Sequence, residues 1–286
     1  MVKISRKISI FANIKKKKTM EQVKMLGALV GDIIGSVYEF CNTKSTDFKL
    51  FYNQSRFTDD SVMTLAVARW LLEDEAHTLH YLIFCMQELG CHYPFAGYGG
   101  RFMRWLYQEN PQPYDSWGNG AGMRVSPVGL YAKTLNEALA LAAVTASVSH
   151  NHPEGVKGAQ AIAACVYLCK EGKTKTEIKK YVEQTFDYNL NRTIAEIRPT
   201  YEFTEACKDS VPEAIIAFLE GNSFEEVLRL AISLGGDSDT IACMACAIAA
   251  CMYPIPEDIA KKCDELLTDD LREIKDKFID MIVSRR

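Results

Sequence analysis

The sequence predicts an all-α protein, with a single compact multi-helix domain over residues 25–286 of the 286-residue chain. Apolar residues recur at the three- and four-residue spacing of helices, and no run of alternating strands is found. Four pairs typical of capping boxes each precede an apolar run; they are Thr134 with Glu137, Thr174 with Glu177, Ser210 with Glu213, and Ser223 with Glu226. No low-complexity linker divides the chain, so we expect one domain.

The first 24 residues differ from the rest of the chain. They hold eight basic residues and one acidic residue, although the whole chain has a net charge of -4. The apolar stretch 8–14 is interrupted by Asn13 and followed by four lysines, which is not the pattern of a secretory signal. We interpret 1–24 as a basic, disordered leader, or as the result of a start codon placed upstream of Met20 or Met25. The acidic remainder argues against a dedicated nucleic-acid-binding protein.

The N-terminal half of the domain is expected to begin with two helices. The first, over 23–36, carries Gly27, Gly31 and Gly35 on one face, which lets another helix approach closely. The second, over 61–75, shows a clear helical period of apolar residues. Gly, Pro, Asn, aromatic and His residues gather in the segments between helices, where a site is expected; these predicted loops are 41–57, 91–101, 108–128 and 149–156.

The C-terminal half is expected to hold further helices and no membrane span. A helix over 212–220 is predicted to end at Gly221. The longest apolar run, 241–253, has thirteen residues, fewer than the roughly 20 that a helix needs to cross a bilayer. It contains Cys243 and Cys246, two of ten cysteines, which we interpret as buried free thiols. Without a secretory signal, this cysteine usage indicates a reducing compartment and a cytoplasmic protein.

Two acidic clusters each precede an apolar helix, and they are the main indication of a site. The first is Thr58-Asp59-Asp60 and the second is Asp237-Ser238-Asp239-Thr240. One interpretation is helix capping, but a cap needs only one such side chain. The four carboxylates and the two threonine hydroxyls of these clusters are hard oxygen ligands that suit Mg²⁺ or Mn²⁺. If the two helix N-termini face each other, two divalent cations bridged by one carboxylate would neutralise the repulsion.

Six segments, in this order along the chain, resemble motifs of the ADP-ribosylglycohydrolases of the dinitrogenase-reductase-activating glycohydrolase type. They are 27–39 (GALVGDIIGSVYE), 57–61 (FTDDS), 97–102 (GYGGRF), 116–129 (SWGNGAGMRVSPVG), 149–155 (SHNHPEG) and 233–240 (SLGGDSDT). The resemblance implies an all-helical domain of this family with a binuclear Mg²⁺ or Mn²⁺ centre. It further implies that Thr58, Asp59 and Asp60 bind one ion, that Asp237 and Thr240 bind the other, and that Asp239 bridges them.

The resemblance also implies roles in catalysis and substrate binding. The catalytic candidates are Glu39, Asp59, Asp60 and Asp237. Two loops and a histidine segment are expected to bind substrate, with His150 favoured over His152 for the phosphate or ribose; these residues are Gly97, Tyr98, Gly99, Ser116, Trp117, Gly118, Asn119, His150 and His152. The stretch 116–120 resembles the family's diphosphate-binding loop, in which small residues let backbone amides approach phosphate oxygens.

The expected function is therefore metal-dependent hydrolysis of the glycosidic bond between ADP-ribose and an acceptor. The partner would be an ADP-ribosylated protein or a small ADP-ribose conjugate. We expect a monomer that binds no membrane, and nucleic acid only as an ADP-ribosylated substrate. Two alternatives stay open, a non-catalytic ADP-ribose-binding or structural relative, and a two-metal phosphohydrolase that cleaves the diphosphate. The sequence does not decide between arginine, serine, O-acetyl and nucleic-acid linkages, or which carboxylate is the general acid or base.

Overall fold

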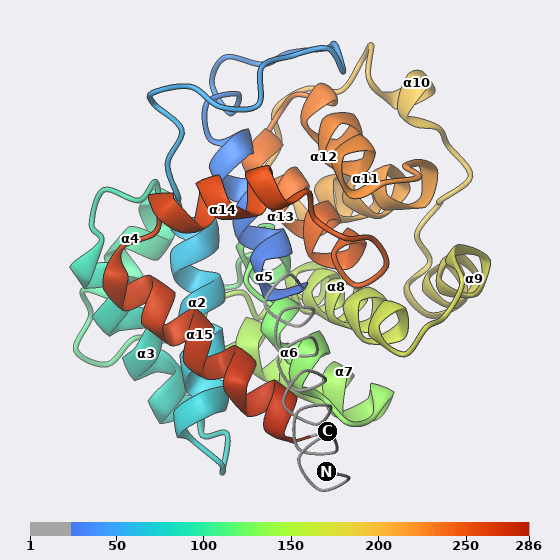
Figure 1. Cartoon of the computed structure of the whole chain (residues 1–286). Coiled ribbons are helices and arrows are strands. Elements are labelled where there is room, and N and C mark those ends of the chain that lie inside the picture. Colours follow the sequence, from blue (N-terminus) through green and yellow to red (C-terminus); the bar gives the residue numbers. More distant parts are fainter. Residues whose placement is uncertain (1–23, 286) are drawn as a thin grey trace, which may run out of the picture.

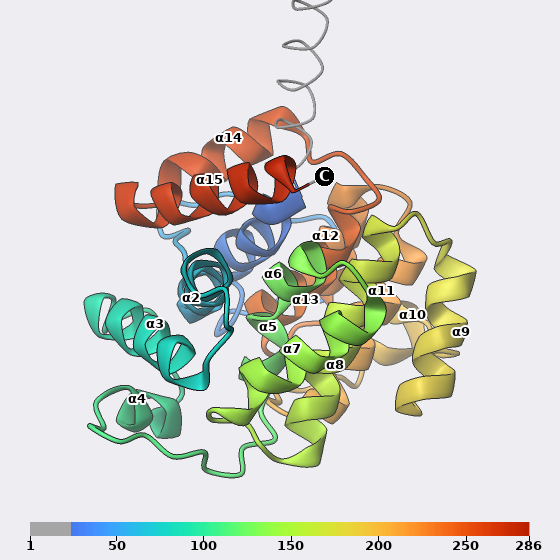
Figure 2. The same ribbon diagram turned by 90° about the horizontal axis from the view of Figure 1, so that it is seen from below.

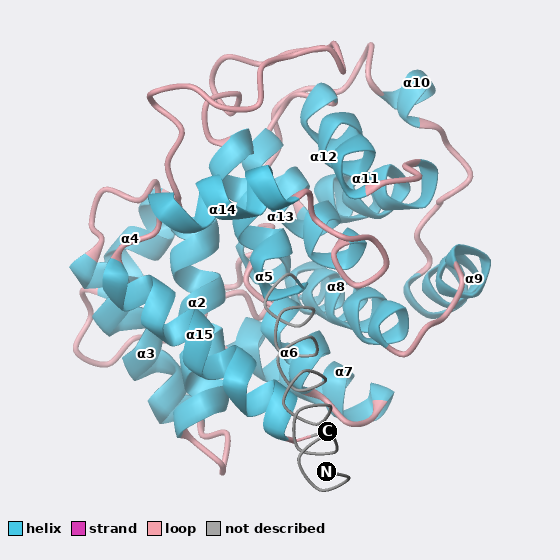
Figure 3. Cartoon of the chain, viewed as in Figure 1, coloured by secondary structure: helices cyan, strands magenta, loops and turns pink. Residues whose placement is uncertain are grey.

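A computed structural model describes residues 24–285, and in that part of the chain it contains helices and no strand (Figures 1 and 3). The all-α prediction is confirmed. The predicted leader 1–24 lies outside the described residues, apart from Lys24, which is the first described residue of a helix over 24–35. No helix in the described part is long and apolar enough to cross a membrane.

The helix over 24–35 is followed by short and long helices that are joined by loops. Their bounds are α2 (Asp59–Glu73), α3 (Leu79–His92), α4 (Gly100–Leu106), α5 (Gly120–Met123), α6 (Ser126–Tyr131), α7 (Leu135–Ser147), α8 (Pro153–Lys170), α9 (Lys175–Phe186), α10 (Ile194–Ile197), α11 (Cys207–Glu220), α12 (Phe224–Ser233), α13 (Ser238–Ala249), α14 (Glu257–Leu266) and α15 (Asp269–Ser284).

The centre of the molecule is the contact between the helix over 24–35 and α13, every residue of which is buried. A Cβ atom added to Gly27 would lie 2.5 Å from the Cβ atom of Ala250, and one added to Gly31 would lie 2.2 Å from the carbonyl oxygen of Ala242. Both distances are shorter than any carbon or oxygen contact in a packed interior. The predicted close approach along the glycine face is therefore confirmed, and its partner is α13.

The other helices cover this central pair on several sides. Figure 2 shows α14 and α15 side by side over the helix of 24–35 and α2, with α3 and α4 at one edge. The helices α7, α8 and α9 lie toward the opposite side, and α8 packs against both α7 and α9. Helix α13 also contacts α2 and α5, and the first turns of α2 and α13 meet in the interior, where the Thr240 hydroxyl donates to Asp60.

Most of the predicted helix ends agree with the structure. Thr134, Thr174 and Ser223 are the N-caps of α7, α9 and α12, and each side chain accepts a hydrogen bond from the backbone N–H of the predicted glutamate. Helix α11 ends at Glu220 and is capped by Gly221, as predicted. All ten cysteines are free, and Cys243 and Cys246 are buried, so the interpretation of these thiols is confirmed.

Two local predictions are wrong. Ser210 is not an N-cap but lies inside α11, which begins at Cys207. Its hydroxyl donates to the carbonyl oxygen of Ala206, so this buried side chain has a hydrogen-bond partner without capping a helix. The predicted loop 108–128 contains α5 and the start of α6. These helices of 4 and 6 residues are too short to show a helical period in sequence.

Candidate active site

A cavity of about 490 Å³ opens at the point where the first turns of α2 and α13 meet. Thirteen of the predicted site residues line it, and they come from segments spread over 200 positions of the chain; they are Glu39, Asp59, Asp60, Gly97, Tyr98, Gly99, Ser116, Gly118, Asn119, His150, Asp237, Asp239 and Thr240. Thr58 is buried behind them as the N-cap of α2. The fold therefore brings most of the predicted site into one place.

Besides Thr58, two of the predicted residues, Trp117 and His152, do not line the cavity. The Trp117 side chain is 51% exposed. His152 is the N-cap of α8, and its Nδ1 atom accepts a hydrogen bond from the backbone N–H of Glu154 at 3.1 Å. In the described structure, His152 has the role of a capping residue, whereas His150 faces the cavity.

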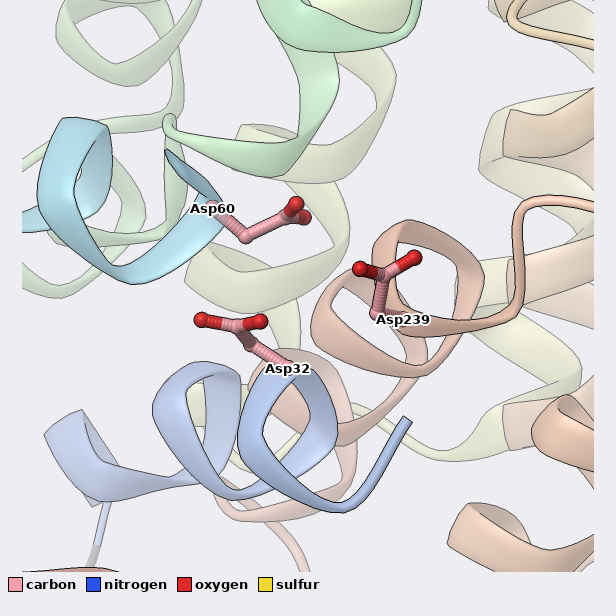
Figure 4. Close-up of side chains that lie close together, drawn as sticks. All are labelled: Asp32, Asp60 and Asp239. Atoms are coloured by element: carbon pink, nitrogen blue, oxygen red, sulfur yellow. The ribbon is translucent and has the colours of Figure 1, made fainter. Parts of the chain in front are cut away.

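Carboxylates gather in two groups that share one residue. The carboxylate oxygens of Asp32, Asp60 and Asp239 lie within 4.8 Å of one another, and so do those of Glu39, Asp237 and Asp239. Figure 4 shows the first group, with side chains from three different helices that point toward a common space. Asp239 therefore occupies the position between two possible cation sites.

Asp32 is a member of this cluster that sequence reasoning missed. It is fully buried on the helix over 24–35. Its Oδ2 atom accepts hydrogen bonds from the backbone N–H groups of Thr58 at 2.9 Å and Ser61 at 3.0 Å, and from the Ser61 hydroxyl. Its Oδ1 atom accepts from the Thr58 hydroxyl at 2.6 Å. A signal was present in the sequence, because Asp32 is the one charged residue in the apolar run 25–38.

The other carboxylates are held by polar neighbours. Asn119 donates from Nδ2 to Oδ2 of Asp237 at 2.7 Å, and the Thr240 hydroxyl donates to Oδ2 of Asp60 at 3.1 Å. The second oxygen of Asp60, Oδ1, is buried and has no hydrogen-bond partner among the described residues. Because buried polar atoms are nearly always satisfied, this oxygen is available to a further ligand.

Burial and mutual repulsion dominate the electrostatics of the cluster. Desolvation, and then the neighbouring carboxylates, raise the pKa values of Asp59, Asp60 and Asp239 well above their ordinary value. The same causes, with Asp237 as the largest contribution from a neighbouring charge, raise the pKa of Glu39 to about 7. Hard oxygen donors that are buried and crowded in this way fit divalent cations, which would neutralise the repulsion and favour ionised carboxylates.

The glycine-rich loop 116–120 forms another wall of the cavity. The backbone N–H of Asn119 donates to the carbonyl oxygen of Glu205 at 2.7 Å, and that of Cys207 donates to Trp117 at 3.0 Å. Gly118 and Ala206 form an isolated antiparallel bridge between these two segments. The loop is thus fixed by backbone hydrogen bonds. Because Gly118 and Gly120 have no side chains, space is left above the loop.

A second loop and an aromatic pair complete the opening of the cavity. Gly97 has φ 114°, in a region that favours glycine, and a Cβ atom there would lie 3.3 Å from Oδ1 of Asp59. Beside Glu39, the rings of Phe40 and Phe203 stack at 6.4 Å between centroids, although Phe40 is 85% exposed. Sequence analysis missed the aromatic pair because Phe40 and Phe203 are 163 positions apart and neither belongs to a predicted helix.

Comparisons with known proteins agree with this arrangement. The ADP-ribosylglycohydrolase family profile matches residues 24–286. ADP-ribosylhydrolase ARH3 of Homo sapiens is 26% identical, over 84% of this chain and 88% of its own length. ADP-ribosylarginine hydrolase Tri1 of Pseudomonas putida is 26% identical, over 52% of this chain and 42% of its own. A solved structure titled "ADP-ribosylglycohydrolase-related protein complex" has the same fold, with a TM-score of 0.71 at 20% identity over 93% of this chain and 99% of that one.

Proposed function

Because the chain belongs to the ADP-ribosylglycohydrolase family, we propose that it hydrolyses the glycosidic bond between ADP-ribose and an acceptor and releases ADP-ribose. The observation that carries this proposal is the pair of carboxylate groups joined by Asp239, placed in a cavity beside a glycine-rich loop. The acceptor would be a protein side chain or a small adduct. The relatives named for ADP-ribosyl hydrolysis favour this reaction class.

The cavity residues would hold two divalent cations, Mg²⁺ or Mn²⁺. One ion would be bound by Thr58, Asp59 and Asp60, the other by Asp237 and Thr240, with Asp239 between them. A carboxylate oxygen of Asp32 lies within 4.8 Å of oxygens of Asp60 and Asp239, so Asp32 could also contact the first ion. When bound, such cations supply Lewis acidity and orient the hydroxyl groups of a ribose.

The chain's own residues would provide the remaining chemistry. Cleavage of a glycosidic bond passes through an oxocarbenium-like transition state, which needs a proton for the leaving group or a base for water. Glu39 faces the cavity beside Asp237 and Asp239, where its carboxylate can exchange a proton with water or with the leaving group. We therefore favour Glu39 for this role over Asp59, Asp60 and Asp237, whose oxygens would serve as cation ligands.

The test is release of intact ADP-ribose from arginine-linked and serine-linked conjugates, with Mg²⁺ or Mn²⁺ and again with EDTA. Chromatography separates ADP-ribose from AMP, so it also tests the alternative of a two-metal phosphohydrolase. We expect metal-dependent release of ADP-ribose and no AMP. Asp239→Asn should abolish release, whereas Asp258→Asn, the same change at an exposed carboxylate, should not. Full turnover by the Asp239 variant would refute the proposal.

A non-catalytic ADP-ribose-binding protein is the second candidate function. It would bind ADP-ribose tightly and release nothing from either conjugate. The buried carboxylates count against it, because a protein that only binds ADP-ribose gains nothing from the repulsion between six acidic groups. The expectation of a cytoplasmic monomer continues to rest on the sequence.

A further inference from the structure

A buried positive charge lies on the cavity wall, away from the carboxylates. Arg124, between α5 and α6, is fully buried and lines the cavity. Its Nη2 atom donates to the carbonyl oxygen of Thr145 at 2.7 Å and to the hydroxyl of Ser149 at 2.9 Å, while its Nε atom has no partner. Within residues 24–285 no carboxylate lies at ion-pair distance from this guanidinium. Burial lowers the pKa of Arg124 to about 10, so it stays charged at neutral pH.

A buried cation without an anionic partner is costly unless a ligand supplies the opposite charge. The cavity that Arg124 lines is bordered by the glycine-rich loop 116–120, which resembles the family's diphosphate-binding loop. An anion bound there would offset the cost of burying the guanidinium. The hydrogen bonds of Arg124 go to Thr145 and Ser149 rather than to the loop.

Ser149 connects Arg124 to His150. The Ser149 hydroxyl is fully buried, accepts from Arg124, and lies 2.8 Å from Nδ1 of His150. A hydroxyl has one hydrogen to donate, and a buried hydroxyl nearly always donates it. Among the described residues, Nδ1 of His150 is the one acceptor within reach of this hydroxyl. Ser149 therefore donates to Nδ1, and a neutral His150 must carry its proton on Nε2.

The Nε2 atom of His150 faces the glycine-rich loop. A Cβ atom added to Gly120 would lie 2.9 Å from Nε2, and one added to Gly118 would lie 3.5 Å from it. Glycine at these positions leaves the Nε2 edge accessible from the cavity, and no described residue accepts its proton. Burial, together with the charges of Arg124 and Arg101, holds the pKa of His150 well below its ordinary value, so the ring is neutral at pH 7.

We propose that Arg124 and Ser149 are positioning residues that hold His150 in its Nε2–H tautomer, as a hydrogen-bond donor to an anionic phosphate oxygen above Gly118 and Gly120. The other tautomer would present a lone pair to that oxygen and repel it. Arg124 adds a positive charge beside this donor. The identity of the anion as the diphosphate of ADP-ribose rests on the proposed function, whereas the tautomer does not.

The tautomer is tested directly by NMR of protein with ¹⁵N-labelled histidine. The chain has five histidines, and the signal of His150 is assigned by its loss in His150→Gln. We expect a neutral ring protonated on Nε2 in the wild type across pH 6–8, and a loss of this single state in Ser149→Ala. A ring protonated on Nδ1 in the wild type, or an unchanged ring in Ser149→Ala, would overturn the proposal. This measurement needs no substrate.

The consequence for binding is tested by a double-mutant cycle on ADP-ribose affinity, measured by calorimetry. Ser149→Ala should weaken binding about tenfold, which corresponds to about 1.4 kcal/mol. In His150→Gln the amide nitrogen is a donor whatever Ser149 does, so adding Ser149→Ala should then change affinity less than twofold. An equal loss in both backgrounds would show a merely structural role and overturn the proposal. If the wild type bound no ADP-ribose, the proposed function would fail while the NMR result still decided the tautomer.

Discussion

Replacement of Gly35 by alanine should damage the fold and the carboxylate cluster together. A Cβ atom at this position would lie 2.4 Å from Cα of Asp239 and 2.9 Å from its backbone nitrogen. An ordinary carbon–carbon contact is about 3.5 Å, so the first turn of α13 must move by roughly 1 Å. Overpacking of this kind costs about 1–3 kcal/mol. The gain in helix propensity from glycine to alanine, about 1 kcal/mol, offsets only part of it.

The same movement displaces a proposed cation ligand. Asp239 belongs to both carboxylate groups, whose oxygens lie within 4.8 Å of one another. A misplacement of about 1 Å in a catalytic constellation can cost about 100-fold in rate. We therefore expect Gly35→Ala to lose up to about 2 kcal/mol in the free energy of unfolding, by urea denaturation, and about 100-fold in the rate of ADP-ribose release.

Gly27→Ala is the matched control for this prediction. It lies on the same face of the same helix, and its Cβ atom would lie 2.5 Å from Cys246 and Ala250 at the other end of α13. It should lose a similar free energy of unfolding while it keeps its rate of release. Gly100→Ala, where no atom lies within 4 Å of the new Cβ, should keep the free energy of unfolding. Equal rates for Gly35→Ala and Gly27→Ala at equal loss of stability would refute the reasoning.

Three further predictions concern the same cavity. Asp32→Asn places an amide next to the hydrogen-bond donors of Thr58 and Ser61. We expect a loss of about 1–3 kcal/mol in the free energy of unfolding, by urea denaturation, and weaker Mn²⁺ binding. Unchanged Mn²⁺ affinity would contradict the role of Asp32. Without divalent cations, the raised carboxylate pKa values mean that the folded state binds more protons than the unfolded chain, so stability should fall as the pH rises from about 4 through the pKa of Glu39, about 7. A fixed cation concentration, set at 100 times the Kd at pH 8, should add about 2.7 kcal/mol at pH 8 and less at pH 5 by scanning calorimetry. A pH-independent gain would contradict this. Phe40→Ala should raise KM for a peptide conjugate while the affinity for free ADP-ribose stays within twofold, because Phe40 lies at the exposed rim beside Glu39; an equal loss for both ligands would contradict an acceptor-side role.

Local signals predicted the helices well where one segment contained the whole signal. The capping pair Thr174 and Glu177 forms its reciprocal hydrogen bonds as the spacing implies. The pair Ser210 and Glu213 has the same spacing, yet Ser210 lies within α11 and Glu213 is buried against Arg192. Ser210 instead donates to the carbonyl oxygen of Ala206 one turn earlier, and Glu213 forms an ion pair with Arg192 from another segment. Spacing alone carries no information about such contacts.

The candidate site was predictable in part for a similar reason. Short runs such as Thr58-Asp59-Asp60 contain more side-chain oxygens than a helix cap needs, so they could be identified without knowledge of the fold. Asp32 stands alone in an apolar helix, and its partners lie 26 and 29 positions away. A fully buried aspartate needs several hydrogen-bond donors, and none is available within its own helix. The lone charge therefore predicts that some polar segment must meet this helix, whereas only the fold shows that the segment is the first turn of α2.

The glycine face and the carboxylate cluster depend on one another in the same way. Gly31 and Gly35 flank Asp32 in sequence, and they allow α13 to approach so closely that Asp239 reaches the carboxylates of Asp32 and Asp60. Larger side chains on that face would separate the two helices and widen the distance between possible cation ligands. A stripe of small residues that sequence analysis treats as a packing feature is thus also what sets the spacing of the proposed cation site.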